Sequence, residues 1–302
     1  MVMHLDEAAV RRVLQWYPLI AAMERALAAF STGKVLQPVR NMLTIEEDRR
    51  YLGIMPAVAA DAMGLKLVSF YPGNAGSGLP THMAMVLLFR PDTGEPLAVM
   101  DGRLITEMRT AAVSAAATRC LAAPDAHVLA LLGSGVQAAA HLEALRLVRP
   151  IDEVRVWSRT PAHAERFAAA HGATPMAAEA AVHGADIVVT ATNAVAPILA
   201  GAWLKPGAHV NAVGSPRPGW RELDDTALRN VLIVDSREAA ALESGDVVLS
   251  GAPIYAELGE IFAGVKPAPA TETTVFKSVG LAVEDVAAAK LVYDAALTRS
   301  GK

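Results

Sequence analysis

The sequence Val128-Leu129-Ala130-Leu131-Leu132-Gly133-Ser134-Gly135-Val136-Gln137-Ala138-Ala139-Ala140 decides the fold of this chain. Its first five residues form an apolar run of the length of a buried parallel strand, and the residues after the glycines, through Val148, favour a helix. Gly133 permits a tight turn, Gly135 lets the backbone approach a phosphate group, and the small Ala138 lets helix and strand pack closely. By itself this pattern is equally compatible with an ordinary glycine turn.

After Pro124 the sequence alternates between short β-rich runs and helical segments. The expected strands are 128–132, 154–157, 187–191, 209–213 and 231–235, and the expected helices are 137–148, 161–171 and 177–183. Such alternation implies right-handed crossovers and a parallel sheet. The glycine turn lies in the first strand–helix unit, where a dinucleotide diphosphate binds at the helix N-terminus. We therefore predict an α/β domain with a Rossmann-type, doubly wound parallel sheet.

The chain before Pro124 has a different pattern. From Asp6 to Phe30 apolar residues recur at helical spacing, with a break expected at Pro18. Four β-rich runs follow, and the turn residues 91–94 predict a hairpin between the last two. These runs are 51–55, 65–70, 83–89 and 97–100. A long helix is expected over 103–123. This part predicts an α+β domain with a largely antiparallel sheet, to which a final helix over 281–297 could return.

Composition excludes several classes of protein. The 302 residues are 53% hydrophobic and 19% charged, with a formal net charge of −4, and no basic stripe suggests a nucleic-acid partner. Cys120 is the only cysteine, so neither an internal disulfide nor a paired-thiolate metal site is possible. Histidine spacing predicts no metal site. No apolar window reaches the about 18 residues of a membrane helix, and no signal peptide is evident, so we expect a cytoplasmic protein.

The end of the second expected strand predicts which dinucleotide binds. An NAD enzyme usually has Asp or Glu there, accepting a hydrogen bond from the ribose 2′-hydroxyl. This chain has Ser158, Arg159 and Thr160 instead. The two hydroxyls can donate to a phosphate and the guanidinium can pair with its charges, which favours NADP. The alternative is that Arg159 is a solvated residue at a strand end.

Three cations before the glycine turn are candidates for the substrate site. Arg40 follows Gln37-Pro38-Val39, Lys66 lies within an apolar β-like run, and Arg109 lies within the long helix. A charge inside an apolar strand is costly unless it meets an anion. The alternative for Lys66 is a side chain that points to solvent.

The chain resembles the ornithine cyclodeaminase/mu-crystallin family, and its mu-crystallin type of ketimine reductase in particular. The matching segments extend nearly from end to end. They are 37–40, 51–57, 66–71, 97–116, the glycine turn, 211–214, 217–218, 220–225, 234–250, 256–260 and 274–285. The resemblance implies a dimerisation and substrate domain built from residues 1–120 and 281–302, a Rossmann domain over 121–280, and a homodimer.

The resemblance also implies roles for single residues. The residues matching Arg40, Lys66 and Arg109 bind a substrate carboxylate, and His82 lies close to substrate and nicotinamide. The segment with Lys277 and Ser278 lines the cofactor. Further cofactor contacts are expected beside the glycine turn and at later strand ends. The complete expected cofactor set is Gly133, Gly135, Val136, Gln137, Ser158, Arg159, Thr160, Thr190, Thr192, Val213 and Ser278.

One departure from the family pattern bears on the reaction. Cyclodeaminases of this family carry an acidic residue two positions after the glycine that matches Gly214, whereas Ser215 and Pro216 follow here. Proline cannot act as the general base that cyclodeamination needs. We therefore expect an NADPH-dependent reductase of a cyclic 2-imino acid, such as Δ1-piperideine-2-carboxylate or Δ1-pyrroline-2-carboxylate, that yields the L-amino acid. Lys66, Arg109 and His82 are the expected catalytic residues, with Arg40 and Ser215 binding substrate.

Three other functions remain open from the sequence. They are ornithine cyclodeamination, reductive amination of a 2-oxo acid as in alanine dehydrogenase-like relatives, and NADPH binding without turnover in a crystallin-like protein.

Overall fold

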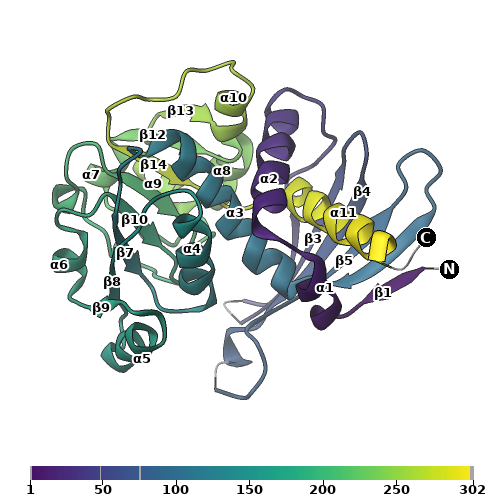
Figure 1. Cartoon of the computed structure of the whole chain (residues 1–302), viewed down its shortest axis with the longest axis horizontal. Coiled ribbons are helices and arrows are strands. Elements are labelled where there is room, and N and C mark those ends of the chain that lie inside the picture. The colour runs from purple at the N-terminus through teal and green to yellow at the C-terminus, as the bar shows by residue number, and fades with distance from the viewer. Residues whose placement is uncertain (1, 48, 75, 300–302) are drawn as a thin grey trace. The chain divides into compact units, whose positions relative to one another are not determined.

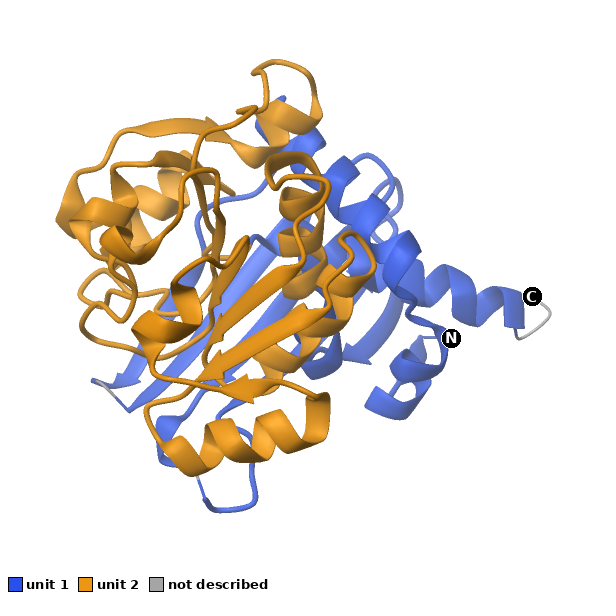
Figure 2. Cartoon of the chain, turned by 60° about the vertical axis from the view of Figure 1, so that its left-hand side comes forward, with its two compact units in different colours: residues 1–109, 281–302 blue, residues 110–280 orange. Residues whose placement is uncertain are grey.

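A computed structural model describes residues 2–47, 49–74 and 76–299. The chain forms two compact units, the first of residues 1–109 with 281–302 and the second of residues 110–280 (Figures 1 and 2). The division falls inside one helix, α3 (Arg103–Leu121). The domain boundary after residue 120 that the sequence indicates therefore stays a prediction, since compactness alone does not define a folding domain.

The described part of the first unit contains a six-stranded sheet in the order β1-β6-β5-β4-β3-β2. Its strands are β1 (Met3–Leu5), β2 (Asn41–Glu46), β3 (Arg50–Val58), β4 (Met63–Phe70), β5 (His82–Phe89) and β6 (Pro96–Asp101). All neighbours are antiparallel except β1 and β6. The expected hairpin joins β5 to β6, where Gly94 has φ 72° and donates its N–H to the Arg90 carbonyl oxygen. The largely antiparallel sheet is confirmed; β1 and β2 were not foreseen.

Helices cover one face of this sheet (Figure 1). They are α1 (Glu7–Val13), α2 (Trp16–Ser31) and α11 (Ala282–Arg299), and α11 packs on β3, β4, β5 and α2. The predicted break at Pro18 is wrong: the helix is interrupted at Leu14 and Gln15, and Pro18 lies in the first turn of α2. Proline is tolerated there because first-turn N–H groups have no partner within the helix.

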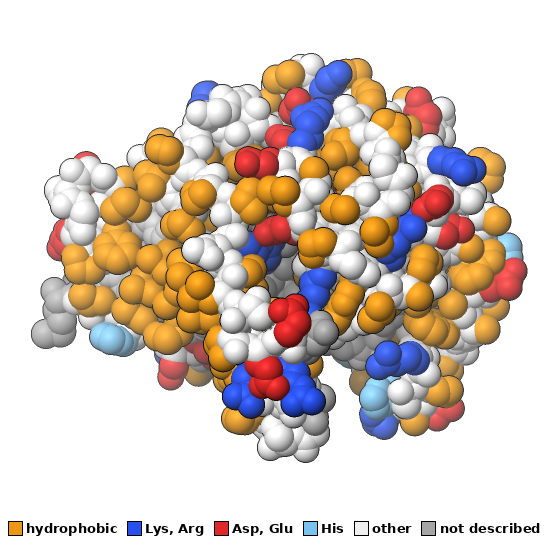
Figure 3. Space-filling view, turned by 180° about the vertical axis from the view of Figure 1, so that it is seen from behind, with side chains coloured by type: hydrophobic (Ala, Val, Ile, Leu, Met, Phe, Trp, Pro, Cys, Tyr) orange, Lys and Arg blue, Asp and Glu red, His pale blue; other side chains and the backbone are white. Residues whose placement is uncertain are grey.

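The opposite face of the same sheet is apolar and is not covered by the described helices of this unit. Residues paired across β3, β4 and β5 alternate between the two faces, so Lys66 and Val86 lie on the helix side while Leu67 and Met85 lie on the other. Met85 is 51% exposed. The residues that share this uncovered apolar face include Leu43, Leu52, Ile54, Leu65, Leu67, Met83, Met85 and Leu87. Figure 3 shows hydrophobic side chains gathered over it.

The described part of the second unit contains an eight-stranded sheet in which every neighbouring pair is parallel. Its order is β13-β12-β14-β11-β10-β7-β8-β9. The strands are β7 (Val128–Leu132), β8 (Glu153–Trp157), β9 (Thr174–Pro175), β10 (Ile187–Thr190), β11 (His209–Ala212), β12 (Val231–Val234), β13 (Ile254–Glu257) and β14 (Thr274–Lys277). From the central β7 the chain builds first towards β8 and then towards β10. This is the doubly wound Rossmann arrangement that the sequence predicts.

The helices of this unit connect the parallel strands. They are α4 (Val136–Arg146), α5 (Pro161–His171), α6 (Ala178–Val182), α7 (Asp225–Leu228), α8 (Arg237–Glu243), α9 (Gly245–Ser250) and α10 (Leu258–Phe262). The sequence predicted α4, α5 and α6 to within two residues, and it did not foresee α7 to α10. Among the described residues, no helix is long and apolar enough to cross a membrane, and no cluster of three or more His, Cys, Asp or Glu side chains is arranged to hold a metal ion.

Candidate active site

The glycine turn has the geometry of a diphosphate cradle. Gly133 has φ 125°, and a Cβ on it would lie 2.5 Å from the Ala191 carbonyl oxygen, so only glycine fits. A Cβ on Gly135 would meet open space. Gly135 is the N-cap of α4, and no side chain caps the N–H groups of that first turn. Free amides and the helix dipole at this point favour an anion, and the open space leaves room for it.

The two residues after Gly135 border the same turn. Val136 is 59% exposed although it is apolar. The buried Oε1 atom of Gln137 has no hydrogen-bond partner among the described residues. Both features fit side chains that a bound dinucleotide would cover, so these two predicted contacts remain consistent with the geometry.

The end of β8 presents Ser158, Arg159 and Thr160 as the sequence places them. Thr160 is the N-cap of α5, yet its side chain makes no capping hydrogen bond. Arg159 and Thr160 are exposed, and no carboxylate follows the strand before α5 begins. These groups are therefore available to a ligand phosphate, and the arrangement lacks the usual acceptor for a ribose 2′-hydroxyl.

Two predicted cofactor residues at the end of β10 serve an internal network. Thr190 and Thr192 donate their hydroxyls to opposite oxygens of Glu222, each at 2.7 Å. Burial raises the pKa of the Glu222 carboxyl, although Lys277 and the two threonines counteract this. These hydroxyls thus hold a buried carboxylate, and their contact with a cofactor stays a prediction.

Other predicted residues lie in the loops that follow β11 and β14. Val213 continues the ladder by donating its N–H to the Thr190 carbonyl oxygen. Ser215 is fully buried and donates its hydroxyl to the Ala194 carbonyl oxygen at 2.6 Å. Ser278 donates its hydroxyl to Asp235 at 2.9 Å. Their predicted roles remain untested, with the two serine hydroxyls already engaged within the protein.

The cations of the first unit form one buried cluster. Lys66, on β4, is 2% exposed, and Arg109, on α3, is 5% exposed. The outward-pointing alternative for Lys66 is therefore wrong. Both cations meet the first turn of α11: Lys66 Nζ lies 2.7 Å from Asp285 Oδ2, and Arg109 donates to Asp285 Oδ1 at 3.1 Å and to Glu284 Oε2 at 2.6 Å.

The internal carboxylates change the interpretation of the cluster. The sequence predicts that a charge inside an apolar strand has to meet an anion, and the buried Glu284 and Asp285 are such anions within the protein. Burial lowers the pKa of Lys66 to about 8, opposed by Asp285, while the charges of Arg109 and Arg40 lower it further. Arg40 is thus within electrostatic reach of Lys66. Positive side chains gathered at one place suit a substrate carboxylate.

His82 lies on the same sheet face as Lys66 but is not part of the cluster. It pairs with Phe70, and the two rings are tilted by 37° with centroids 4.3 Å apart. Phe70 follows Lys66 by four strand positions, about 13 Å along β4. The exposed imidazole therefore lies well away from Lys66 along the strand, and its contact with substrate stays a prediction.

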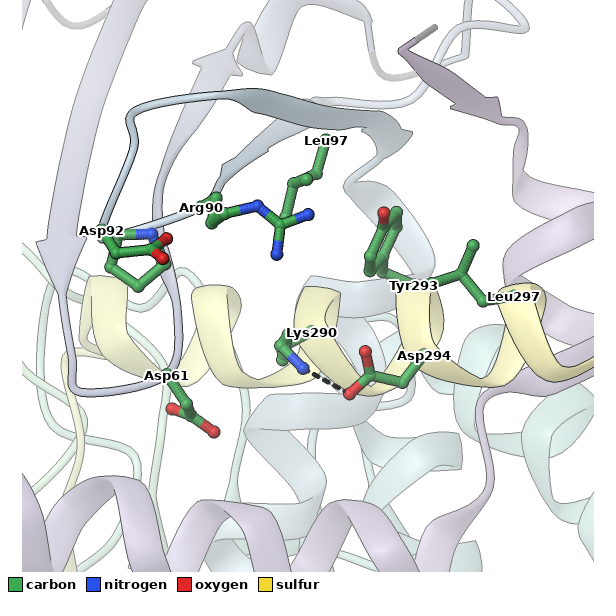
Figure 4. A pocket seen from close by; sticks show the side chains of 9 residues that line it. Asp61, Arg90, Asp92, Leu97, Lys290, Tyr293, Asp294 and Leu297 are labelled. Carbon is green, nitrogen blue, oxygen red and sulfur yellow. Dashed lines mark hydrogen bonds and ion pairs between the residues drawn. The ribbon is translucent and has the colours of Figure 1, made fainter. Parts of the chain in front are cut away.

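A cavity of about 400 Å³ elsewhere in the first unit contains none of the predicted site residues (Figure 4). It lies between the β5–β6 hairpin, the β3–β4 turn and α11. Its described lining is Asp61, Arg90, Pro91, Asp92, Leu97, Lys290, Tyr293, Asp294 and Leu297. Arg90 pairs with Glu95 and Lys290 with Asp294, so these two cations are already compensated locally.

The sequence did not single out the buried carboxylates, which are Glu284 and Asp285 beside Lys66 and Arg109, and Glu222 and Asp246 in the second unit. Glu284 and Asp285 interrupt an otherwise apolar stretch, Leu281-Ala-Val-Glu-Asp-Val-Ala, and such a pair beside a buried strand cation could have been suspected. Glu222 and Asp246 gave no such signal, because acidic residues outside periodic segments are usually solvated.

Known proteins match this chain along nearly its whole length. The profile of the ornithine cyclodeaminase/mu-crystallin family matches residues 2–300. Ketimine reductase mu-crystallin from Mus musculus is 54% identical over 285 residues, which cover 91% of each chain.

Two solved structures share the whole fold. The Δ1-pyrroline-2-carboxylate reductase of Thermococcus litoralis, in complex with NADH and L-proline, has a TM-score of 0.94 at 37% identity and covers 99% of this chain and 98% of that one. An archaeal alanine dehydrogenase dimer with bound NAD has a TM-score of 0.93 at 35% identity, with coverage of 99% and 97%.

Proposed function

Because the chain belongs to the ornithine cyclodeaminase/mu-crystallin family, we propose that it is an NAD(P)H-dependent reductase of cyclic 2-imino acids. Its substrates are of the type of Δ1-piperideine-2-carboxylate and Δ1-pyrroline-2-carboxylate, and the product is the L-amino acid. The similarity to a ketimine reductase and to a pyrroline-2-carboxylate reductase supports this substrate class.

The observation that carries the proposal is the pair of buried cations, Lys66 and Arg109, which meet Glu284 and Asp285. The half-buried Arg40 lies within electrostatic reach of Lys66. These cations provide a carboxylate anchor in a site from which water is largely excluded, where charge-assisted hydrogen bonds are strong.

The reaction asks two things of the protein. The nicotinamide cofactor, when bound, supplies a hydride. The imine carbon accepts it, and the electron pair of the C=N bond becomes the lone pair of the ring nitrogen. An imine that binds as its protonated iminium needs no proton from the protein, so the residues have to anchor the carboxylate and fix the orientation of the ring. Lys66, Arg109 and Arg40 are assigned to that task, and Gly133, Gly135 and the first turn of α4 to the diphosphate.

We infer a preference for NADPH over NADH from the end of β8. Ser158, Arg159 and Thr160 offer a positive charge and two hydroxyls where an NAD-specific site would have a carboxylate. A cytoplasmic location is also proposed, since a single cysteine, Cys120, is typical of a chain that does not depend on disulfides.

Reductive amination of a linear 2-oxo acid is the second candidate, and the likeness to an alanine dehydrogenase favours it. Such a substrate also carries one carboxylate, so the cation cluster suits it equally. Ammonia separates the two reactions, because a preformed cyclic imine does not consume it. Ornithine cyclodeamination is disfavoured by Pro216, which has no side chain able to act as a base.

The deciding assay follows nicotinamide absorbance with purified protein. Both cyclic imines, and pyruvate with and without ammonia, are compared with NADPH and NADH, and ornithine is tested with the oxidised cofactors. We expect ammonia-independent oxidation of NADPH by at least one imine. In Arg40→Leu, which leaves the pairs of Lys66 and Arg109 with α11 intact, turnover should fall at least about 10-fold while NADPH still binds. If neither imine is reduced, the proposal is refuted. If the protein also binds NADPH in that case, the crystallin-like alternative is favoured.

We further propose that the protein is a homodimer joined through the uncovered apolar face of the six-stranded sheet. A contiguous apolar face of this extent is unusual on a monomer, and a second copy of the same face is complementary to it. The dimeric alanine dehydrogenase relative supports this assembly.

The dimer is tested by light scattering after gel filtration. Met85→Glu should give a monomer, because it places a charge on the uncovered apolar face, at a side chain that is 51% exposed. Leu242→Glu is the control, since Leu242 is 55% exposed on α8 of the other unit. A wild-type monomer, or a Met85→Glu dimer as stable as wild type, would contradict the assignment.

A further inference from the structure

The loop after β11 is the most constrained part of the second unit. Ser215 has φ 48°, and it is the one non-glycine residue with a positive φ among those described. Such a backbone costs of order 1–3 kcal/mol and persists only where the surroundings enforce it. The preceding Gly214 has no room for a side chain, since a Cβ would collide with the Thr192 backbone and Glu222.

Three fully buried charged residues surround this loop. Lys277, at the end of β14, donates from Nζ to the Gly214 carbonyl oxygen at 2.6 Å and forms an ion pair with Asp246 at 2.9 Å. Glu222 accepts the Gly214 N–H at 2.9 Å. Both backbone polar groups of Gly214 are therefore held by charged side chains, whose hydrogen bonds are the stronger kind.

The same residues are locked to one another and to the neighbouring strand end. Asp246 accepts the backbone N–H groups of Glu222 and Leu223, both at 2.9 Å. Glu222 receives the Thr192 N–H and hydroxyl and the Thr190 hydroxyl, each at 2.7 Å. The network is thus anchored at the carboxyl ends of β10, β11 and β14.

The position of the loop in the sheet gives the network its significance. In doubly wound sheets a dinucleotide crosses the carboxyl ends of the strands at the point where strand order reverses, which is between β7 and β10 here. The end of β8 is assigned to the adenosine half. The nicotinamide half then extends over β10 and β11, whose following loop contains Val213, Gly214 and Ser215.

We propose that Glu222, Asp246 and Lys277, the loop clamp, are positioning residues that hold the Val213–Ser215 backbone in the strained form that orients the nicotinamide ring for hydride transfer. This inference rests on the proposed reductase function. The printed hydrogen bonds of the loop clamp reach the Gly214 backbone and the end of β10 but neither Gly133 nor Gly135. We therefore expect its loss to affect orientation more than affinity.

Two variants test the loop clamp, and neither leaves Asp246 or Lys277 without its ion-pair partner. Glu222→Gln has the same shape but places an amide NH₂ against the Gly214 or the Thr192 N–H, so one donor loses its acceptor. The double variant Lys277→Met/Asp246→Asn removes the ion pair from both sides, while the amide oxygen of the introduced asparagine can still accept two N–H groups. Lys277→Met alone would leave Asp246 unpaired.

Thr274→Val is the matched control. Thr274 is fully buried at the opposite end of the same strand, β14, and its hydroxyl hydrogen-bonds the His209 imidazole at 2.8 Å. The control variant removes a buried polar contact and destabilises the same sheet without touching the loop, and its kcat should stay within about threefold of wild type.

The expected result is a separation of orientation from binding. In both loop-clamp variants kcat should fall at least about 10-fold, since small misplacements of reacting groups cost up to about 100-fold, while the NADPH dissociation constant changes less than about threefold. The primary deuterium isotope effect with 4-deuterated NADPH should rise, and the fluorescence emission of the bound nicotinamide should shift.

The outcomes separate the two proposals. Unchanged kcat, isotope effect and nicotinamide emission in both variants would overturn the loop-clamp proposal, as would changes equal to those of Thr274→Val. If wild type binds NADPH but reduces no imine, the proposed function fails. The loop-clamp proposal is then supported by a shift in nicotinamide emission in both variants and overturned by its absence.

Discussion

Replacing Asp285 with Asn tests the buried charge cluster most sharply. The side chain keeps its shape and an oxygen that can accept from Arg109, but the charge facing Lys66 at 2.7 Å is lost. At that separation and an effective dielectric constant of about 20, a pair of unit charges interacts by about 6 kcal/mol, and breaking a buried pair costs about 3–5 kcal/mol in practice. If about 3 kcal/mol of this reaches the Lys66 ammonium, the pKa of Lys66 falls by about 2, from about 8 to about 6.

The loss of kcat/KM in Asp285→Asn should depend on pH. A variant whose site is simply unfolded would lose activity at every pH. At pH 7.5 Lys66 is mostly protonated in wild type but mostly neutral in Asp285→Asn. Losing one charge-assisted hydrogen bond to the substrate carboxylate, about 1.5–3 kcal/mol, should lower kcat/KM about 10- to 100-fold. At pH 5.5 the amine is protonated in both proteins and the loss should largely disappear.

The assay is a pH profile of kcat/KM for the preferred imine, with thermal denaturation to confirm folding. Asp294→Asn is the control, since Asp294 lies on the same helix, pairs with Lys290 and is half-exposed. In wild type kcat/KM should fall above about pH 8 as Lys66 loses its proton, and Lys66→Arg should move this limb to higher pH. An Asp285→Asn profile parallel to wild type would refute the reasoning, and so would an unmoved limb in Lys66→Arg.

Other predictions concern the cofactor and stability. Arg159→Leu should raise the KM for NADPH about 10- to 100-fold and leave that for NADH unchanged; equal effects on both in steady-state kinetics would contradict the NADP assignment. Gly135→Ala should keep the melting temperature, because its Cβ meets open space. The variant should weaken NADPH binding about 10-fold in fluorescence titration, and unchanged affinity would mean that the diphosphate does not bind at this turn. Burial lowers the pKa of His141 to about 4 and that of His209 to about 3. Both stay neutral when folded, so stability should fall as the pH drops from about 6.5 towards 4; urea unfolding that is no easier at pH 5 than at pH 7.5 would argue against this.

Local sequence patterns were enough for five of the parallel strands of the second unit because these strands are largely buried and therefore largely apolar. The apolar run 128–132 matches β7 residue for residue, and 161–171 matches α5. The strands β9 and β13 were not among the expected strands, and only the assembled sheet places β14 between β11 and β12.

The amino acid sequence by itself determined the doubly wound fold and the glycine turn and singled out the three candidate cations, because each depends on local residue type and spacing. Only the tertiary structure decided which charges meet. Asp285 lies 219 positions after Lys66 in the chain, yet the packing of α11 on β4 brings their charges into contact. The same holds for Glu222 and Lys277 around Gly214. Electrostatic energy in a protein interior depends on distance and burial, and neither can be obtained from separation along the sequence.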